Sequence, residues 1–115
     1  MTHEAVLEAS SAPQAGTPSP DEQALVAAVV RKDRKATAEF VERFADPVHA
    51  YVRHRLAPRA DLVEDLVQDV FLAALKGLPS FAGRSSLKTW LIGIARHKVE
   101  DFYRAQLRRA ETPSD

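Results

Sequence analysis

The stretch DLVEDLVQDVFLAALKG, from Asp61 to Gly77, decides the fold class of this sequence. Its apolar residues recur at steps of three and four, which is the spacing of one face of an α-helix. These residues are Leu62, Val63, Leu66, Val67, Val70, Phe71 and Leu75. The polar residues that share the other side are Glu64, Asp65, Gln68 and Asp69. The pattern predicts a helix from about Asp61 to Lys76, with Asp61 and Glu64 as an acidic capping pair and Gly77 as the C′ residue.

A second amphipathic segment follows this helix after a loop, residues 78–85, that contains a proline and a glycine. Apolar residues at helical spacing predict a helix that begins near Ser85 or Ser86 and continues to about Arg108. The residues expected to face the core are Leu87, Leu91, Ile94, Ala95, Val99 and Phe102. The basic residues expected on the opposite side are Lys88, Arg96, Arg104 and Arg108.

The first helix of the sequence has a clear start signal. Ser19 is a candidate N-cap, Pro20 suits the first helical position, and Glu22 stands where a capping box requires it. Four apolar residues then recur at helical spacing: Leu25, Val26, Val29 and Val30. This helix is expected to end near residues 31–33.

The next helix is predicted to begin at Asp33 or Thr37 and to end at Pro58. Its apolar stripe consists of Phe40, Phe44, Val48, Tyr51, Val52 and Leu56. Helical periodicity favours core packing as the role of these aromatic residues. Pro47 interrupts the stripe and should kink the helix or break it in two, because its ring clashes with the preceding turn.

The domain organisation follows from these elements. Residues 1–19 are rich in Ala, Ser, Pro and Thr and carry too little apolar surface to offset the entropy of ordering, so we expect a disordered tail. Residues 20–109 are expected to form one helical domain, and residues 110–115 a C-terminal tail or linker. No strand-like alternation and no internal repeat occurs in the sequence. The fold class is therefore predicted to be all-α, a compact bundle of about four helices.

Composition excludes several classes of protein. The chain has 115 residues, of which 45% are hydrophobic and 28% charged, as in ordinary globular proteins. With no cysteine it has no disulfide and no thiolate metal site. The four histidines lack metal-binding spacing, and glycine loops for phosphate or nucleophile motifs are absent, so we expect neither an enzyme nor a metal or cofactor site. No apolar run approaches the roughly 20 residues of a membrane span, so we expect no membrane insertion and a cytoplasmic location.

Charge is balanced overall but unevenly distributed. There are 16 basic and 16 acidic residues, which taken alone argues weakly against a nucleic-acid partner. Residues 60–75 carry four acidic residues and no Lys or Arg, whereas residues 84–109 carry seven basic and two acidic residues, a net of +5. The sequence therefore has an acidic segment followed by a basic one.

The order of these segments resembles the second conserved region of bacterial sigma factors of the extracytoplasmic-function type. EDLVQDVF, Glu64–Phe71, resembles the polymerase-binding helix of that family. FAGRSSLKTWL, Phe81–Leu91, followed by IAR at 94–96 and Asp101, resembles its DNA-opening segment. The resemblance begins near Asp21 and runs to about Arg109.

The resemblance implies two binding surfaces and no cofactor. The first surface binds the clamp helices of the β′ subunit of RNA polymerase core, and its expected residues are Arg53, Arg55, Glu64, Asp65, Gln68 and Asp69. The second recognises and melts the −10 promoter element on the non-template strand. Its expected residues are Phe81, Gly83, Arg84, Ser85, Ser86, Lys88, Thr89, Trp90, Arg96, His97, Lys98, Arg104 and Arg108. For Trp90 two roles stay open: stacking against the DNA fork, or core packing.

The sequence also departs from the family. His97 stands where an asparagine is common, which puts a contact from that position in doubt. A complete member continues into a helix-turn-helix domain that reads the −35 element, and we expect that domain to be absent from this sequence. An anti-sigma factor is a further expected partner.

Two other functions remain open. One is a sigma-like interaction module that binds polymerase or an anti-sigma factor without opening the promoter. The other is a helix-turn-helix repressor, which the eight-residue loop disfavours because such motifs use a shorter turn.

Overall fold

The computed structural model of the protein describes residues 16–111 as an all-α fold. Four α-helices follow one another, α2 (Pro20–Val30), α3 (Arg34–Leu56), α4 (Val63–Gly77) and α5 (Leu87–Glu111). Two short 3₁₀ turns, η1 (Ala60–Leu62) and η2 (Leu78–Ser80), flank α4. The predicted fold class is confirmed. Most of the expected N-terminal tail, and residues 112–115, lie outside the described residues.

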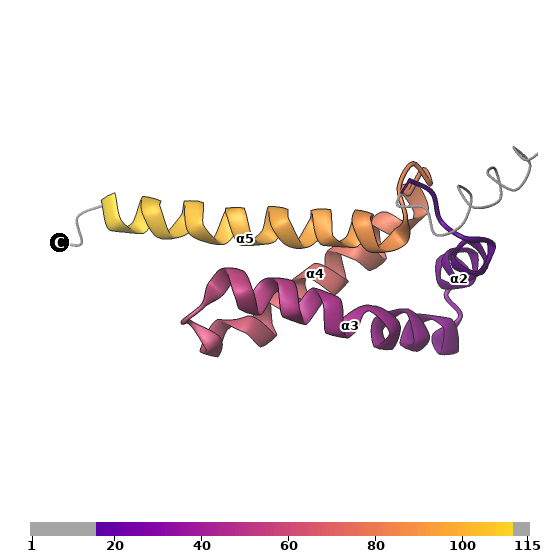
Figure 1. Cartoon of the computed structure of the whole chain (residues 1–115), viewed down its shortest axis with the longest axis horizontal. Coiled ribbons are helices and arrows are strands. Elements are labelled where there is room, and N and C mark those ends of the chain that lie inside the picture. The colour runs from indigo at the N-terminus through magenta and orange to yellow at the C-terminus, as the bar shows by residue number, and fades with distance from the viewer. Residues whose placement is uncertain (1–15, 112–115) are drawn as a thin grey trace, which may run out of the picture.

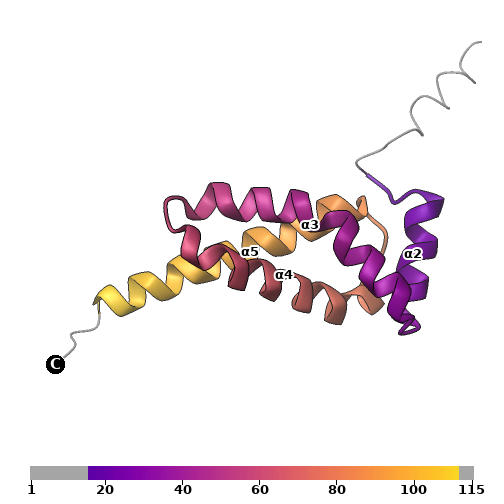
Figure 2. The same cartoon turned by 90° about the horizontal axis from the view of Figure 1, so that it is seen from below.

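Helices α3, α4 and α5 pack against one another, and α2 crosses one end of this three-helix unit (Figures 1 and 2). The core between them is made of aliphatic and aromatic side chains from all four helices. The largest fully buried ones are Phe40, Leu56, Leu78, Leu87, Leu91, Val48, Val52 and Val70. Within residues 16–111 no polar or charged residue is buried, so the bundle is held mainly by apolar burial.

The first two helices begin where the sequence predicts. The Ser19 hydroxyl accepts a hydrogen bond from the Glu22 backbone N–H at 3.1 Å and caps α2. The Asp33 carboxylate accepts from the Ala36 backbone N–H at 3.0 Å and caps α3. Between them Lys32 adopts φ +72°, the left-handed conformation that lets the chain reverse between the two helices.

Pro47 does not break α3. The helix runs unbroken from Arg34 to Leu56, so of the two predicted outcomes, a kink or a break, the break does not occur. Figure 2 shows a change of direction near its middle, as expected where proline removes one intrahelical hydrogen bond. Burial of Phe44 and Val48 on either side keeps both halves of the helix on the core.

The predicted caps of α4 are wrong at both ends. The Asp61 carboxylate accepts a hydrogen bond from Nε of Arg59 at 3.4 Å and caps no helix, and this contact holds the pKa of Asp61 below its usual value. Gly77 has φ −88° and belongs to the helix, so it is not a left-handed C′ residue. Gly77 lies next to Trp90, since a Cβ at this position would be 3.4 Å from the indole ring, an ordinary van der Waals contact.

Helix α5 is longer than predicted. It begins at Leu87, after Ser86, whose hydroxyl accepts from the Thr89 backbone N–H at 3.1 Å. It continues to Glu111, and its last turns project beyond the ends of α3 and α4 (Figure 1). Most of the predicted core residues of this helix are buried, whereas Ile94 and Phe102 are half-buried.

Candidate polymerase and nucleic-acid interfaces

One candidate interface is the polar side of α4. We call Glu64, Asp65, Gln68 and Asp69 the acidic stripe. All four side chains are exposed. The stripe continues into Leu72, which is 56% exposed although it is a large apolar residue. Leu72 lies four residues after Gln68 on the same face, and the sequence pattern predicts no role for it. The structure thus places an apolar side chain at the end of an acidic surface.

A chain of hydrogen bonds links α3 to the acidic stripe. Nη1 of Arg53 lies 2.8 Å from Nδ1 of His49, and Nε2 of His49 lies 3.2 Å from Oε2 of Glu64. Because a guanidinium group only donates, Nδ1 accepts, and Nε2 donates to the Glu64 carboxylate. His49 therefore connects Arg53 and Glu64, two residues predicted for the same interface, although no sequence pattern predicts a role for His49.

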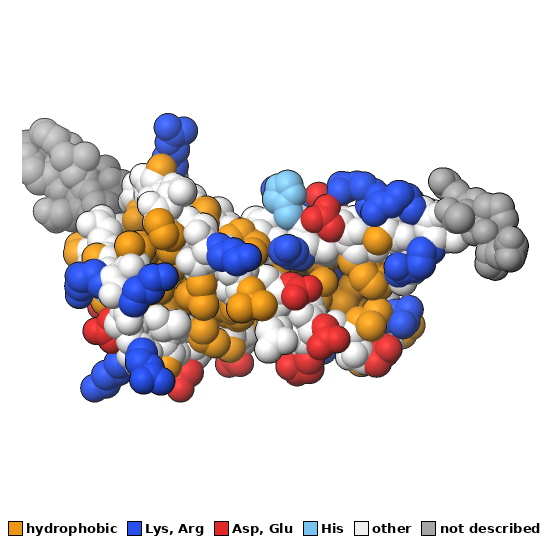
Figure 3. All heavy atoms as spheres, turned by 180° about the vertical axis from the view of Figure 1, so that it is seen from behind, with side chains coloured by type: hydrophobic (Ala, Val, Ile, Leu, Met, Phe, Trp, Pro, Cys, Tyr) orange, Lys and Arg blue, Asp and Glu red, His pale blue; other side chains and the backbone are white. Residues whose placement is uncertain are grey.

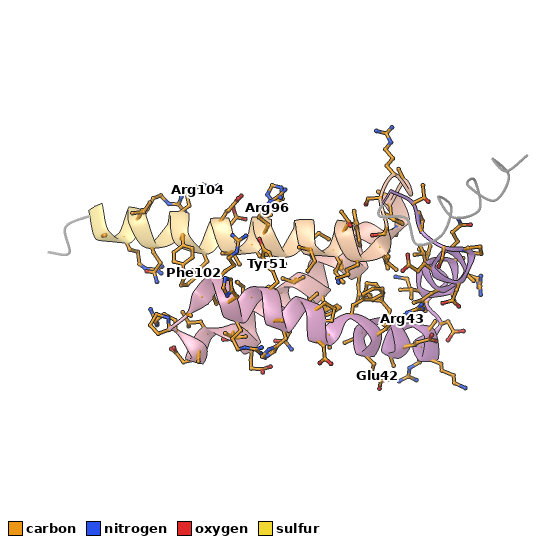
Figure 4. The ribbon with its side chains drawn as sticks, viewed as in Figure 1. Glu42, Arg43, Tyr51, Arg96, Phe102 and Arg104 are labelled. Carbon is orange, nitrogen blue, oxygen red and sulfur yellow. The ribbon has the colours of Figure 1, made fainter. Side chains whose placement is uncertain are left out.

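Arg55 lies elsewhere. Its guanidinium lies over the ring of Tyr51, 4.6 Å from the centroid, and its carbonyl accepts from the Tyr103 hydroxyl at 2.9 Å. Tyr51 points into the space between α3 and α5 (Figure 4). The structure therefore brings Arg53 to the acidic stripe and directs Arg55 toward α5. Residues two positions apart on an α-helix point in directions about 200° apart, so Arg53 and Arg55 do not share one contact surface.

The second candidate interface is the loop between η2 and α5. Phe81 and Trp90 are half-buried, and their ring centroids lie 5.1 Å apart. The Trp90 ring also lies close to Gly77, as described above, and packs on the edge of the core. Of the two roles left open for Trp90, the geometry favours packing, with the indole in contact with Phe81 and the edge of the core.

The start of α5 is fixed by side-chain hydrogen bonds. The Ser86 hydroxyl donates to Oγ1 of Thr89 at 3.0 Å, and the Ser85 hydroxyl donates to the Ser86 carbonyl at 3.1 Å. The Leu87 backbone N–H donates to Oε1 of Glu22 in α2 at 3.3 Å. Glu22 was predicted to complete a local capping box. Its carboxylate instead satisfies a helix N-terminus 65 residues away.

A cavity of about 370 Å³ opens between the loop and the start of α2. Phe81, Ala82 and Gly83 line it on the loop side. Its other walls are Thr17, Pro18, Gln23 and Val26. Gly83 has φ +75°, a conformation that favours glycine, and this bends the loop around the cavity.

Basic side chains surround the loop and follow α5. Arg84, Lys88 and Arg96 are exposed, and within residues 16–111 none of the three has an ion-pair partner. Arg96 and Arg104 point away from α3 (Figure 4), and Figure 3 shows Lys and Arg side chains gathered along α5. Arg104 contacts Asp101 at 2.7 Å. His97 and Arg108 are exposed as well.

Lys98 is separated from these cations. It is half-buried and shares the face of Ala95 and Phe102, which lie three residues before and four residues after it. Arg84 therefore lies in the loop, Lys88 in the first turn of α5 and Arg96 further along the same helix, all three exposed, whereas Lys98 is half-buried.

No group of three or more His, Asp or Glu side chains within residues 16–111 is arranged to hold a metal ion. None of the helices in that part of the chain combines the length and the hydropathy needed to cross a membrane.

Comparison with known proteins identifies the family. A family model described as sigma-70 region 2 matches residues 40–109, more than half of the chain. The chain belongs to the sigma-70 region 2 family. The matched residues include the acidic stripe, the loop and the basic part of α5. The resemblance found in the sequence is thereby confirmed, whereas the roles of individual side chains stay predictions.

Individual relatives agree with this assignment. The chain is 36% identical over 98 residues to the ECF RNA polymerase sigma factor SigC of Mycobacterium tuberculosis, covering 84% of this chain and 52% of that protein. It is 39% identical over 88 residues to the ECF RNA polymerase sigma-E factor of Escherichia coli K12, covering 76% of this chain and 45% of that protein. The chain thus spans about half the length of these sigma factors.

A solved structure supports the fold. An engineered region 2 of sigmaE, determined by NMR in complex with GTAAAA, superposes with a TM-score of 0.69 at 33% sequence identity. The superposition covers 78% of this chain and 93% of that one. The two proteins therefore have the same helical architecture in addition to similar sequences.

Proposed function

We propose that this region 2 domain binds the clamp helices of the RNA polymerase β′ subunit and recognises and melts the −10 promoter element. It acts as a binding module without catalysis, in the cytoplasm, with an anti-sigma factor as its expected regulator. The observation that carries the proposal is the pairing of the acidic stripe on α4 with the cavity-bearing loop and free cations at the start of α5. One domain thereby presents one surface suited to a basic protein and another suited to nucleic acid.

Polymerase binding is supported by the exposure of the acidic stripe. Asp65, Gln68 and Asp69 stand on one face of a rigid helix with no intramolecular ion pair among residues 16–111. Complementary charge steers association and fixes the register of docking, so a basic partner surface fits this face. The exposed Leu72 adds an apolar contact within the same surface.

DNA opening is supported by the loop. Melting a duplex exposes unstacked bases that a protein can hold in a pocket while cations track the phosphates. The cavity beside Phe81 offers such a pocket, and the exposed cations Arg84, Lys88 and Arg96 follow its lining residues along the chain. The complex of sigmaE region 2 with GTAAAA gives a precedent for a six-nucleotide ligand on this fold.

The function is tested by capture of the 115-residue chain on an isolated β′ clamp-helix fragment, with and without an oligonucleotide carrying a single-stranded −10 element. We expect binding to both. Binding to the protein alone would support an interaction module, which the zero net charge of the chain also favours. Binding to neither would overturn the proposal while leaving the fold untouched.

The DNA surface has its own test in salt dependence. Replacing Arg84 and Lys88 with alanine should weaken single-strand binding, because two phosphate contacts are lost. The slope of log affinity against log salt should become shallower by about 1.4, since each contact on a single strand contributes about 0.7. Fluorescence anisotropy titrations at several salt concentrations measure both quantities.

A matched control removes the same charge elsewhere. Arg34 and Lys35 are exposed at the start of α3, outside the predicted DNA contacts. Replacing both with alanine should leave the salt slope close to that of the unmodified chain. An unchanged slope in the Arg84→Ala, Lys88→Ala variant would remove these two residues from the DNA surface.

A further inference from the structure

Helix α2 lies before the residues matched to the family model, which begin at position 40. It nevertheless touches the DNA-binding loop through adjacent residues. Glu22 accepts the hydrogen bond from the Leu87 backbone N–H, which fixes α2 against the start of α5. Gln23 follows directly and lines the cavity beside Phe81. Figure 1 shows the segment that leads into α2 passing beside the loop that precedes α5.

The cavity is large enough for a nucleobase and has a defined polar group. Its volume of about 370 Å³ lies at the lower end of the range of small-ligand pockets. Phe81 presents an aromatic ring in one wall, on which a base can stack. The Gln23 amide stands on the α2 side of the same cavity, so a base stacked on Phe81 has its edge within reach of α2.

The hydrogen-bonding state of Gln23 determines what it can recognise. Its Nε2 donates to the Pro18 carbonyl at 3.3 Å, which holds the amide against the cavity wall. A glutamine amide has two N–H donors and a carbonyl acceptor. One N–H and Oε1 therefore remain available. This pair complements the N7 acceptor and the N6 amino donor of adenine, whereas guanine presents two acceptors along the same edge.

We propose that Gln23 on α2 is a specificity-determining residue that reads the base held in the loop cavity and selects adenine. The inference rests on the proposed DNA-binding function. It assigns base recognition to two segments: the loop supplies the stacking surface, and α2 supplies the hydrogen-bonding edge. Glu22 acts as a positioning residue, because its bond to Leu87 N–H keeps the two segments in register.

The test uses the hexamer GTAAAA and base analogues with the 115-residue chain. Each adenine is replaced in turn by 7-deazaadenine, which lacks the N7 acceptor but keeps the amino group. At one position the unmodified chain should lose about tenfold in affinity. Gln23→Ala should bind the unmodified hexamer about tenfold more weakly and show no further loss with 7-deazaadenine at that position. Gln23→Glu, which keeps the shape but removes the N–H donors, should behave likewise.

Controls separate this result from general damage. The salt slope of Gln23→Ala should stay unchanged, because no charge is removed. Gln106→Ala, at a glutamine whose side chain pairs with Arg109 on the distant part of α5, should keep the 7-deazaadenine effect.

Two outcomes would overturn the inference alone: retained sensitivity to 7-deazaadenine in Gln23→Ala, or an unmodified chain that binds the hexamer with equal affinity for every analogue. An unmodified chain that binds no single strand would overturn the proposed DNA function, and the inference with it.

Discussion

Replacing Asp65 and Asp69 with lysine is expected to reduce binding to the β′ clamp helices by at least about a hundredfold. Both carboxylates are exposed on one face of α4, four residues apart, and within residues 16–111 neither has an ion pair. The double substitution changes the local charge from −2 to +2. Like charges brought together across an interface cost several kcal/mol, and about 2.7 kcal/mol corresponds to a hundredfold loss of affinity. Biolayer interferometry with an isolated clamp-helix fragment measures the effect.

A matched control uses the same spacing on another helix. Glu42 and Asp46 are exposed on α3 and also lie four residues apart. The Glu42→Lys, Asp46→Lys variant changes the net charge by the same amount and should retain most of the affinity. Circular dichroism should report unchanged helicity for both variants. Equal loss in both would indicate a general charge effect and would contradict a docking role for the acidic stripe.

Helix positions could be predicted from the sequence because the signals are local. The start signals at Ser19 and Asp33 lie within three residues of the N–H groups that they satisfy. Predictions of caps failed where another contact or geometry competes with the cap. Asp61 bonds to Arg59, two residues before it, and caps no helix, and Gly77 keeps a negative φ where α4 leads directly into η2. The Glu22 carboxylate bonds to the Leu87 N–H, 65 residues away, and no local pattern in the sequence reveals that partner.

The candidate site was predictable to the level of segments. Helical periodicity put the acidic stripe on one face of α4, and the structure agrees. The structure adds contacts between residues distant in sequence, which no local pattern reveals: His49 on α3 to Glu64 on α4, and Glu22 on α2 to Leu87 at the start of α5. It also separates Arg55 and Lys98 from the surfaces proposed for them, since Arg55 is exposed over the Tyr51 ring and Lys98 is half-buried.

Balanced net charge is compatible with two partners of opposite sign. The acidic stripe on α4 and the cations of the loop and α5 occupy different helices, so each surface keeps its local potential. Figure 3 shows Lys and Arg side chains along the upper edge, over α5, and further basic side chains at the lower left, whereas most of the acidic side chains on this face lie along its lower edge. Because charges beyond about 8–10 Å are largely screened at physiological salt, the local distribution governs each interface more than the sum does.

Replacing Phe40 with alanine is expected to lower the free energy of unfolding by about 3–5 kcal/mol. The Phe40 side chain is completely buried, and its ring centroid lies 5.6 Å from that of Phe44 and 5.9 Å from that of Phe71. It therefore joins α3 to the helix that carries the acidic stripe. Since domains of this size are stable by only about 5–15 kcal/mol, the loss removes a large part of the total.

Urea denaturation followed by circular dichroism measures this loss as a lower midpoint with an unchanged slope, since the native fold and the area exposed on unfolding stay nearly the same. Leu72→Ala is the control, because its side chain is 56% exposed and its truncation should change the free energy of unfolding by no more than about 0.5 kcal/mol. A loss below about 1 kcal/mol for Phe40→Ala would mean that the α3–α4 contact contributes little to the core. A comparable loss for Leu72→Ala would mean that Leu72 supports the fold. Its exposure on α4 would then no longer be evidence for a docking surface.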